Sequence, residues 1–171
     1  CLSHESVHIS RHGTGDEENA RLMGFAAPSL REIANVVSAL TDPAKIVLNC
    51  VLQNPGIHDR PGLCQYLEAA AGAGVRNVSF VGFFMANAYC REHYVSPAKI
   101  DVSGDARFRL WTHFHDYDFC SCRGGDYLSR HGPIRFYYRC PGQASPDYCR
   151  QLVYTADNRL TAGFGGPELS L

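Results

Sequence analysis

The sequence predicts an α/β protein built on a parallel sheet. Two apolar segments, residues 46–52 and 75–84, have the length and composition of buried strands. The segment between them, residues 60–73, carries its apolar residues on one side, as a helix packed on a sheet does. Strands separated by a helix pair in parallel through a right-handed crossover. A strand and helices upstream complete the order β-α-β-α-β.

The upstream elements follow from local patterns. Residues 6–11 alternate between apolar and polar types, which predicts a short strand. A polar loop follows, with Asp16 as the expected N-cap of a short helix that ends at residue 22. A longer helix is expected from Ser29, because apolar residues recur at helical spacing: Leu30, Ile33, Ala34, Val37 and Leu40.

The pattern becomes less regular after residue 85. Residues 87–95 read as a loop, and residues 100–110 fit a helix or a strand equally well. Residues 113–132 are polar, aromatic and Gly-rich with no period, so no regular element is expected there.

Three further strands are predicted near the C-terminal end. Residues 134–139 form one, and residues 151–155 and 160–164 form a β-hairpin around a polar turn. We therefore expect two regions, residues 1–95 with the main α/β unit and residues 96–171 as an extension.

Composition and charge exclude several classes of protein. A formal net charge of −1 and a hydrophobic content of 45% argue against disorder and against a polybasic nucleic-acid surface. The apolar runs are too short for a membrane span, and the start lacks the pattern of a signal peptide. We expect neither nucleic acid nor membrane as a partner. Because residue 1 is Cys1 rather than Met, we expect a processed, engineered or partial chain.

Two of the eight cysteines lie in elements predicted to be buried. Cys50 lies in an apolar strand and Cys64 on the apolar side of a helix, so both are expected in the core. A chain of this length does not need a disulfide framework, which favours a reducing, cytoplasmic compartment.

The first candidate site is Ser10-Arg11-His12, at the carboxyl end of the first strand. Ligands of parallel α/β sheets bind at the carboxyl ends of strands. Ser10 and Arg11 have the side chains to hold a carboxylate or a phosphate. The alternative is an ordinary polar start of a loop.

The second candidate is Asn49, a polar residue inside an apolar strand. A buried amide that lacks partners costs about 1–3 kcal/mol, so Asn49 is bonded either to backbone or to a ligand.

The third candidate is the end of the next strand. Gly82 lets a flat ligand approach the backbone, and Phe83 and Phe84 have rings that can stack on it. Ordinary core packing is the alternative there.

The fourth candidate is a group of metal-type residues between positions 113 and 149. Thiolate and imidazole ligands suit zinc or iron–sulfur sites, but the paired CxxC motifs of common zinc sites are absent. Scattered residues in an irregular region are the alternative. The group consists of His113, His115, Cys120, Cys122, Cys140 and Cys149.

The order of these segments resembles the second half of a radical S-adenosylmethionine (SAM) enzyme. The group with the closest pattern includes the GTP-cyclising enzyme of molybdopterin synthesis. Residues 7–10 resemble the fourth strand of a partial (β/α)6 barrel, residues 47–53 with their central Asn the fifth, and residues 75–82 the sixth. Residues 149–160 are similar to the β-hairpin that follows an auxiliary-cluster cysteine in that group.

The resemblance implies a function and a set of cofactors. In such enzymes a [4Fe–4S] cluster donates an electron to SAM, and the resulting 5′-deoxyadenosyl radical takes a hydrogen atom from the substrate. The substrate would be a small molecule or a peptide, and the electron donor a flavodoxin or ferredoxin. The residues that would contact SAM are Ser10, Arg11, Asn49, Phe80, Gly82 and Met85.

Three features of the family pattern differ in this chain, and one of them is that the Gly-rich acidic motif of the second strand is missing. The CxxxCxxC motif that binds the cluster is absent from this chain, so we expect the C-terminal part of the enzyme, which would not cleave SAM alone. The auxiliary-cluster pattern is incomplete, which leaves an iron–sulfur or zinc site on Cys120, Cys122, Cys140 and Cys149 as a hypothesis. The alternative function is a stand-alone zinc-binding structural module built on residues 113–149. A third is a barrel-derived enzyme that uses no radical and binds phosphate.

Overall fold

The structure is a computed structural model that describes residues 6–83, 87–96, 100–111, 123–139, 152–154 and 160–162. The helices are α1 (Asp16–Met23), α2 (Leu30–Ala39), the 3₁₀ turn η1 (Pro43–Lys45), α3 (Arg60–Gly72) and α4 (Ala88–Glu92). The strands are β1 (Val7–Ser10), β2 (Ile46–Leu52), β3 (Asn77–Gly82), β4 (Phe108–Leu110), β5 (Arg123–Ser129), β6 (Gly132–Arg139), β7 (Leu152–Tyr154) and β8 (Leu160–Ala162).

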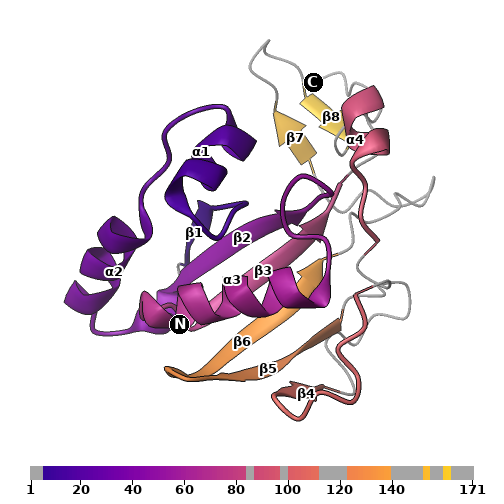
Figure 1. Ribbon diagram of the computed structural model, residues 1–171. Coiled ribbons are helices and arrows are strands. Elements are labelled where there is room, and N and C mark those ends of the chain that lie inside the picture. Colours follow the sequence, from indigo (N-terminus) through magenta and orange to yellow (C-terminus); the bar gives the residue numbers. More distant parts are fainter. Residues whose placement is uncertain are drawn as a thin grey trace.

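Six of the strands form one mixed sheet in the order β1-β2-β3-β6-β5-β4 (Figure 1). Strands β1, β2, β3 and β6 run parallel, whereas β5 is antiparallel to both of its neighbours. The sheet is open, with β1 and β4 as its edges in the described part of the chain. The mixed α/β class is thereby confirmed, but the partial barrel is not, because the sheet does not close.

The predicted β-α-β-α-β order is present. Strand β2 has the predicted bounds, and β3 is shorter than predicted because pairing with β2 runs only from Asn77 to Gly82. Helix α2 begins with a capping box: Ser29 accepts a hydrogen bond from Glu32 N, and the Glu32 carboxylate accepts one from Ser29 N. The predicted cap of α1 was wrong. Gly15 is its N-cap, and Asp16 is its first residue.

Two segments expected to be irregular contain regular elements. The predicted loop at residues 87–95 includes α4, a short helix that starts where the Asn87 side chain accepts a hydrogen bond from Cys90 N. Strand β5 lies within residues 113–132 and pairs with β6 and β4. Strands β4–β6 therefore extend the same sheet as β1–β3, whereas β7 and β8 form the predicted hairpin by themselves.

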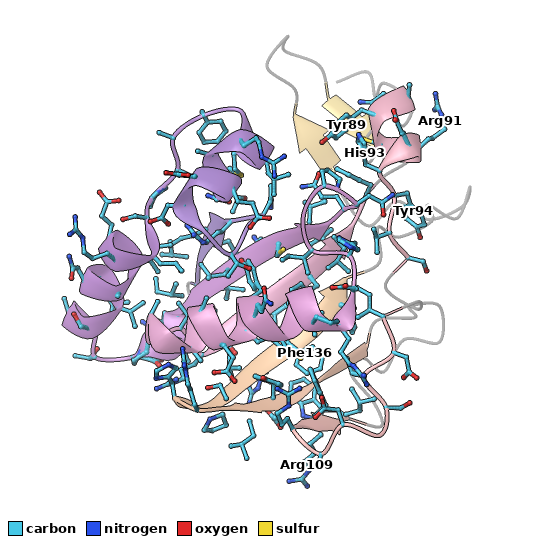
Figure 2. All side chains as sticks on the ribbon, in the orientation of Figure 1. Tyr89, Arg91, His93, Tyr94, Arg109 and Phe136 are labelled. Carbon is cyan, nitrogen blue, oxygen red and sulfur yellow. The ribbon has the colours of Figure 1, made fainter. Side chains whose placement is uncertain are left out.

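Helix α4 carries aromatic side chains near the carboxyl ends of the parallel strands. Figure 2 shows Tyr89 and His93 on or next to this helix, and their rings are 4.3 Å apart in an edge arrangement. Tyr94 forms an isolated bridge with Gln53, the residue after β2, which ties this segment to the end of the strand.

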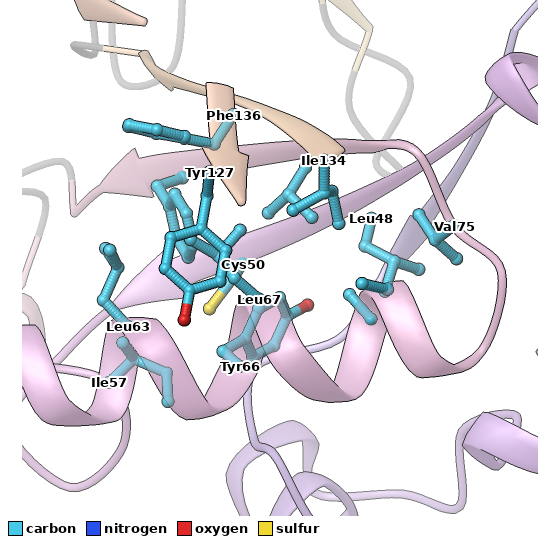
Figure 3. Close-up of a cluster of buried hydrophobic side chains, with 14 of the residues drawn as sticks. Leu48, Cys50, Ile57, Leu63, Tyr66, Leu67, Val75, Tyr127, Ile134 and Phe136 are labelled. Atoms are coloured by element: carbon cyan, nitrogen blue, oxygen red, sulfur yellow. The ribbon is translucent and has the colours of Figure 1, made fainter. Parts of the chain in front are cut away.

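The hydrophobic core lies between the sheet and the helices α2 and α3. Figure 3 shows the α3 side chains Leu63, Tyr66 and Leu67 facing buried residues of β2, β5 and β6. Ile33 and Val37 of α2 belong to the same core. The predicted core positions of Cys50 and Cys64 are confirmed, and burial raises the pKa of both thiols.

The described helices include none that is long and apolar enough to cross a membrane.

Candidate functional site

The sheet has a second face, opposite α3, that differs in chemistry from the core face. Side chains alternate along a strand, and Leu48, Phe80 and Phe136 lie on the α3 side. Residues one position away therefore lie on the other side. We call this side the polar face, because it carries a run of hydrophilic residues: His8, Ser10, Asn49, Asn77, Ser79, Arg109, Asp126, Arg135 and Tyr137.

Four residues of the polar face lie in one line across the sheet. The strand register pairs Ser10 with Asn49, Asn49 with Ser79, and Ser79 with Tyr137. Neighbouring strands are about 4.8 Å apart, so this line spans roughly 14 Å. We call these four residues the polar row. It brings together two residues predicted from the sequence, Ser10 and Asn49, on adjacent strands.

Asn49 has a half-satisfied amide. His8 Nδ1 lies 3.3 Å from Asn49 Oδ1, and because this oxygen only accepts, the imidazole donates. The Nδ2 group of Asn49 has no hydrogen-bond partner among the described residues. Two N–H donors on the half-buried Asn49 are therefore unused by the described residues.

Ser79 stands next to Asn49 and is fully buried. Its Oγ has no hydrogen-bond partner in the described part of the structure. A buried hydroxyl without a partner costs about 1–3 kcal/mol, so such groups are uncommon unless a water or a ligand completes them. The neighbouring Ser10 is exposed, and its hydroxyl is likewise without a partner within the described ranges.

His12 lies at the carboxyl edge of the sheet, just beyond β1. Its Nδ1 accepts a hydrogen bond from Val51 N at 3.2 Å. This fixes the neutral tautomer with the proton on Nε2. Burial is the main cause that lowers the pKa of His12. The imidazole therefore offers a fixed N–H donor near the end of the strand.

The Arg11 side chain is buried inside the protein and does not face a ligand site as the sequence predicted. Its side chain is 1% exposed, and its guanidinium donates to the Asp16 carboxylate at 2.8 Å and to the carbonyls of Thr14 and Pro28. Its own carbonyl accepts a hydrogen bond from Tyr66. All of these partners belong to the protein, so Arg11 holds the loop between β1 and α2 in place.

Phe80 and Gly82 do not lie with the polar row. Phe80 is fully buried on the α3 side, where its ring packs against Tyr66 and Tyr138. Gly82 ends β3 opposite Leu52 and is buried as well. The other predicted SAM contact, Met85, lies outside the described residues.

The predicted metal ligands also lie outside the described residues. This applies to Cys120, Cys122, Cys140 and Cys149, and to His113 and His115. Within the described ranges, no group of three or more His, Cys, Asp or Glu side chains is arranged to hold a metal ion.

Sequence reasoning missed Ser79 and Tyr137. Ser79 interrupts an apolar strand just as Asn49 does, so the same signal was present in both strands. Tyr137 looked like one of several aromatic residues of a short strand. Only the register shows that it continues the line from Ser79.

No family model matches the chain, and no curated protein matches it.

Proposed function

We propose that this chain binds SAM on the polar face of its sheet and contributes that site to a radical SAM enzyme acting on a small molecule or peptide. The observation that carries the proposal is the direct register of Ser10 and Asn49 with the unpartnered hydroxyl of Ser79. Expectations of an electron donor such as flavodoxin or ferredoxin, and of a cytoplasmic location, belong to the same proposal.

The residues of the polar row suit the polar half of SAM. Ribose hydroxyls and the amino-acid group of SAM need both donors and acceptors of hydrogen bonds. Asn49 Nδ2 supplies donors, and the hydroxyls of Ser10 and Ser79 supply either role. The layout of the sheet supports the proposal as well, because β1, β2 and β3 are parallel and their connecting helices α2 and α3 share one core on the opposite side.

The chain does not fit the electron-donating cluster. Its eight cysteines contain no CxxxCxxC triplet, so we assign no cluster ligand to it. When a [4Fe–4S] cluster and SAM are bound together in such an enzyme, they supply a radical that abstracts hydrogen from the substrate. The part we propose for this chain is to hold and orient SAM beside the substrate.

Calorimetric titration of the 171-residue chain with SAM tests the proposal. We expect saturable binding that Asn49→Ala weakens by about tenfold, because one good hydrogen bond is worth about 1 kcal/mol or slightly more. Ser79→Ala is the sharper variant. It should weaken SAM binding without lowering the free energy of unfolding, because the native hydroxyl has no partner to lose.

Asn35→Ala provides the control, since Asn35 is an exposed residue of α2. We expect it to leave the affinity unchanged. The proposal fails if SAM does not bind, or if the Asn49 and Ser79 variants bind SAM as well as the Asn35 variant does.

A further inference from the structure

A second group of side chains on the polar face involves strands β4, β5 and β6. Trp111 follows β4, and its backbone N–H bonds to Gly124 O, in line with Tyr137 of the polar row. Asp126 of β5 stands directly opposite Arg135 of β6 in the antiparallel pair. Arg135 also lies beside Asn77 of β3, two residues along the strand from Tyr137.

Among the side chains of Trp111, Asp126 and Arg135, the Asp126 carboxylate bonds to Trp111. Trp111 Nε1 donates to Asp126 Oδ2 at 3.0 Å. The guanidinium carbon of Arg135 lies 5.3 Å from the centroid of the Trp111 ring, within the range of a cation–π contact. Although Asp126 and Arg135 are cross-strand neighbours, they form no ion pair in this described region.

Arg135 is therefore an exposed side chain that is held in position by the indole ring. The indole ring holds its guanidinium, yet none of its side-chain N–H groups has a hydrogen-bond partner among the described residues. A guanidinium presents five donors in a planar fork that matches the two oxygens of a carboxylate or a phosphate. The neighbouring Asp126 carboxylate does not occupy this fork, because it accepts its hydrogen bond from Trp111 instead.

We propose that Arg135, held by Trp111, binds an anionic group of the ligand that occupies the polar face, either a carboxylate or a phosphate. The Cβ atoms of Arg135 and Tyr137 are roughly 7 Å apart on one strand, so such a group would sit just beside the polar row. The proposal rests on the polar face being a ligand site, as in the proposed function, but not on the ligand being SAM.

Trp111 provides the measurement, because it is the only tryptophan in the chain. Its fluorescence is followed while the 171-residue chain is titrated with inorganic phosphate and, separately, with acetate, against sodium chloride at matched ionic strength. We expect a saturable change with at least one of the two anions. A stronger response to phosphate assigns a phosphate-bearing ligand, and a stronger response to acetate assigns a carboxylate.

Three variants identify the group responsible. Arg135→Gln should weaken anion binding by about tenfold or more, and Arg135→Lys should fall between that variant and the parent because the charge stays and the fork is lost. Arg109→Gln is the matched control: an exposed arginine of the same face that also neighbours Asp126. It should change the affinity by no more than about twofold.

The outcomes separate this inference from the SAM proposal. If phosphate or acetate binds through Arg135 while SAM does not bind, the SAM proposal fails and the anion site stands. If both anions give only the response seen with chloride, the anion site is wrong. Equal losses in Arg135→Gln and Arg109→Gln would also overturn it, because the effect would then be one of general charge.

Discussion

His12 continues the pairing of β1 with β2 past the point where β1 ends. Arg11 N still donates to Asn49 O, and the next acceptor for β2 is the imidazole of His12, which receives Val51 N. A side chain thus replaces a backbone carbonyl in the ladder. It can do so only while Nδ1 is unprotonated, which links the end of the strand to pH.

We expect the protein to lose stability in acid through His12. Burial leaves the folded-state pKa of His12 below its usual value of 6.5, although a backbone hydrogen bond to Arg11 acts in the opposite direction, so folding favours the neutral form. That contribution is fully present above about pH 6.5 and is lost as the pH falls through the lower folded-state pKa. Urea denaturation at several pH values between about 5 and 8 measures it.

His12→Phe tests the assignment. This variant should be less stable by about 1 kcal/mol at pH 8, because Val51 N loses its acceptor. Its stability should then fall less steeply than that of the parent between about pH 7 and 5. An unchanged slope would mean that another group causes the acid dependence.

Single residues also show where sequence reasoning stops. A polar residue in an apolar strand was enough to single out Asn49, and the strand end was enough for Ser10. The sequence did not reveal on which side of the sheet the Phe80 side chain lies, because that depends on the register between strands. The burial of Arg11 depends on contacts with Asp16, Thr14 and Pro28 that a sequence pattern does not reveal.

At the scale of elements, the β5–β6 hairpin extends the sheet beyond β3 and connects it to β4. The strands are joined by a two-residue turn, Arg130-His131, followed by Gly132, whose φ of +100° favours glycine. Tyr127 of β5 donates to the Glu68 carboxylate of α3 at 2.9 Å, and burial is the main cause that raises the pKa of this phenol. The hairpin is thereby fixed to both the sheet and the helix.

We expect Gly125→Ala to destabilise the hairpin. A Cβ atom at this position would lie 2.6 Å from Arg109 O and 3.1 Å from the Phe136 ring, so β4 or the ring must move. Overpacking of this kind costs about 1–3 kcal/mol, which urea denaturation detects as a lower free energy of unfolding.

The control for that prediction is Gly15→Ala. A Cβ atom at Gly15 meets nothing within 4 Å, and its backbone angles suit any residue. Because Gly15 is the N-cap of α1, we expect a loss of less than about 1 kcal/mol. Equal losses in the two variants would show that the crowding at Gly125 is relieved at no cost.

The elements differ in how well the sequence predicts them. Strand β2 and helices α2 and α3 combine apolar periodicity with clear caps, and their bounds were predicted to within a residue or two. Strand β5, with the sequence RGGDYLS, has two glycines and an aspartate and no apolar alternation. Its pairing with β4 and β6 comes from tertiary contacts. Helix α4 is too short to show a period.

At the scale of the whole molecule, we expect the described sheet to unfold in one step. The core joins α2 and α3 to β5 and β6, so among the described residues the hairpin shares one hydrophobic core with the helices. Far-UV circular dichroism follows the helices, whose longest members lie within residues 30–72, and fluorescence follows Trp111 next to β4. The two urea transitions should coincide.

A Trp111 transition at lower urea than the helical transition would contradict this expectation. It would support the division into residues 1–95 and 96–171 that the sequence suggested. The α/β class at this scale was predictable, because strands and helices alternate along the first half of the chain. The joining of β6 to β3 was not, since no local pattern pairs segments that are so far apart.

The polar row crosses the junction between β3 and β6. Asn49 and Ser79 belong to the continuous β-α-β unit. Tyr137 of the row and its neighbour Arg135 belong to β6, which joins that unit through the β3–β6 ladder. A ligand that touched Asn49 and Arg135 together would act as a cross-link between two parts of the chain. Its binding would be thermodynamically linked to the docking of β6, so the free energy needed to separate β6 from β3 would rise with the concentration of the ligand.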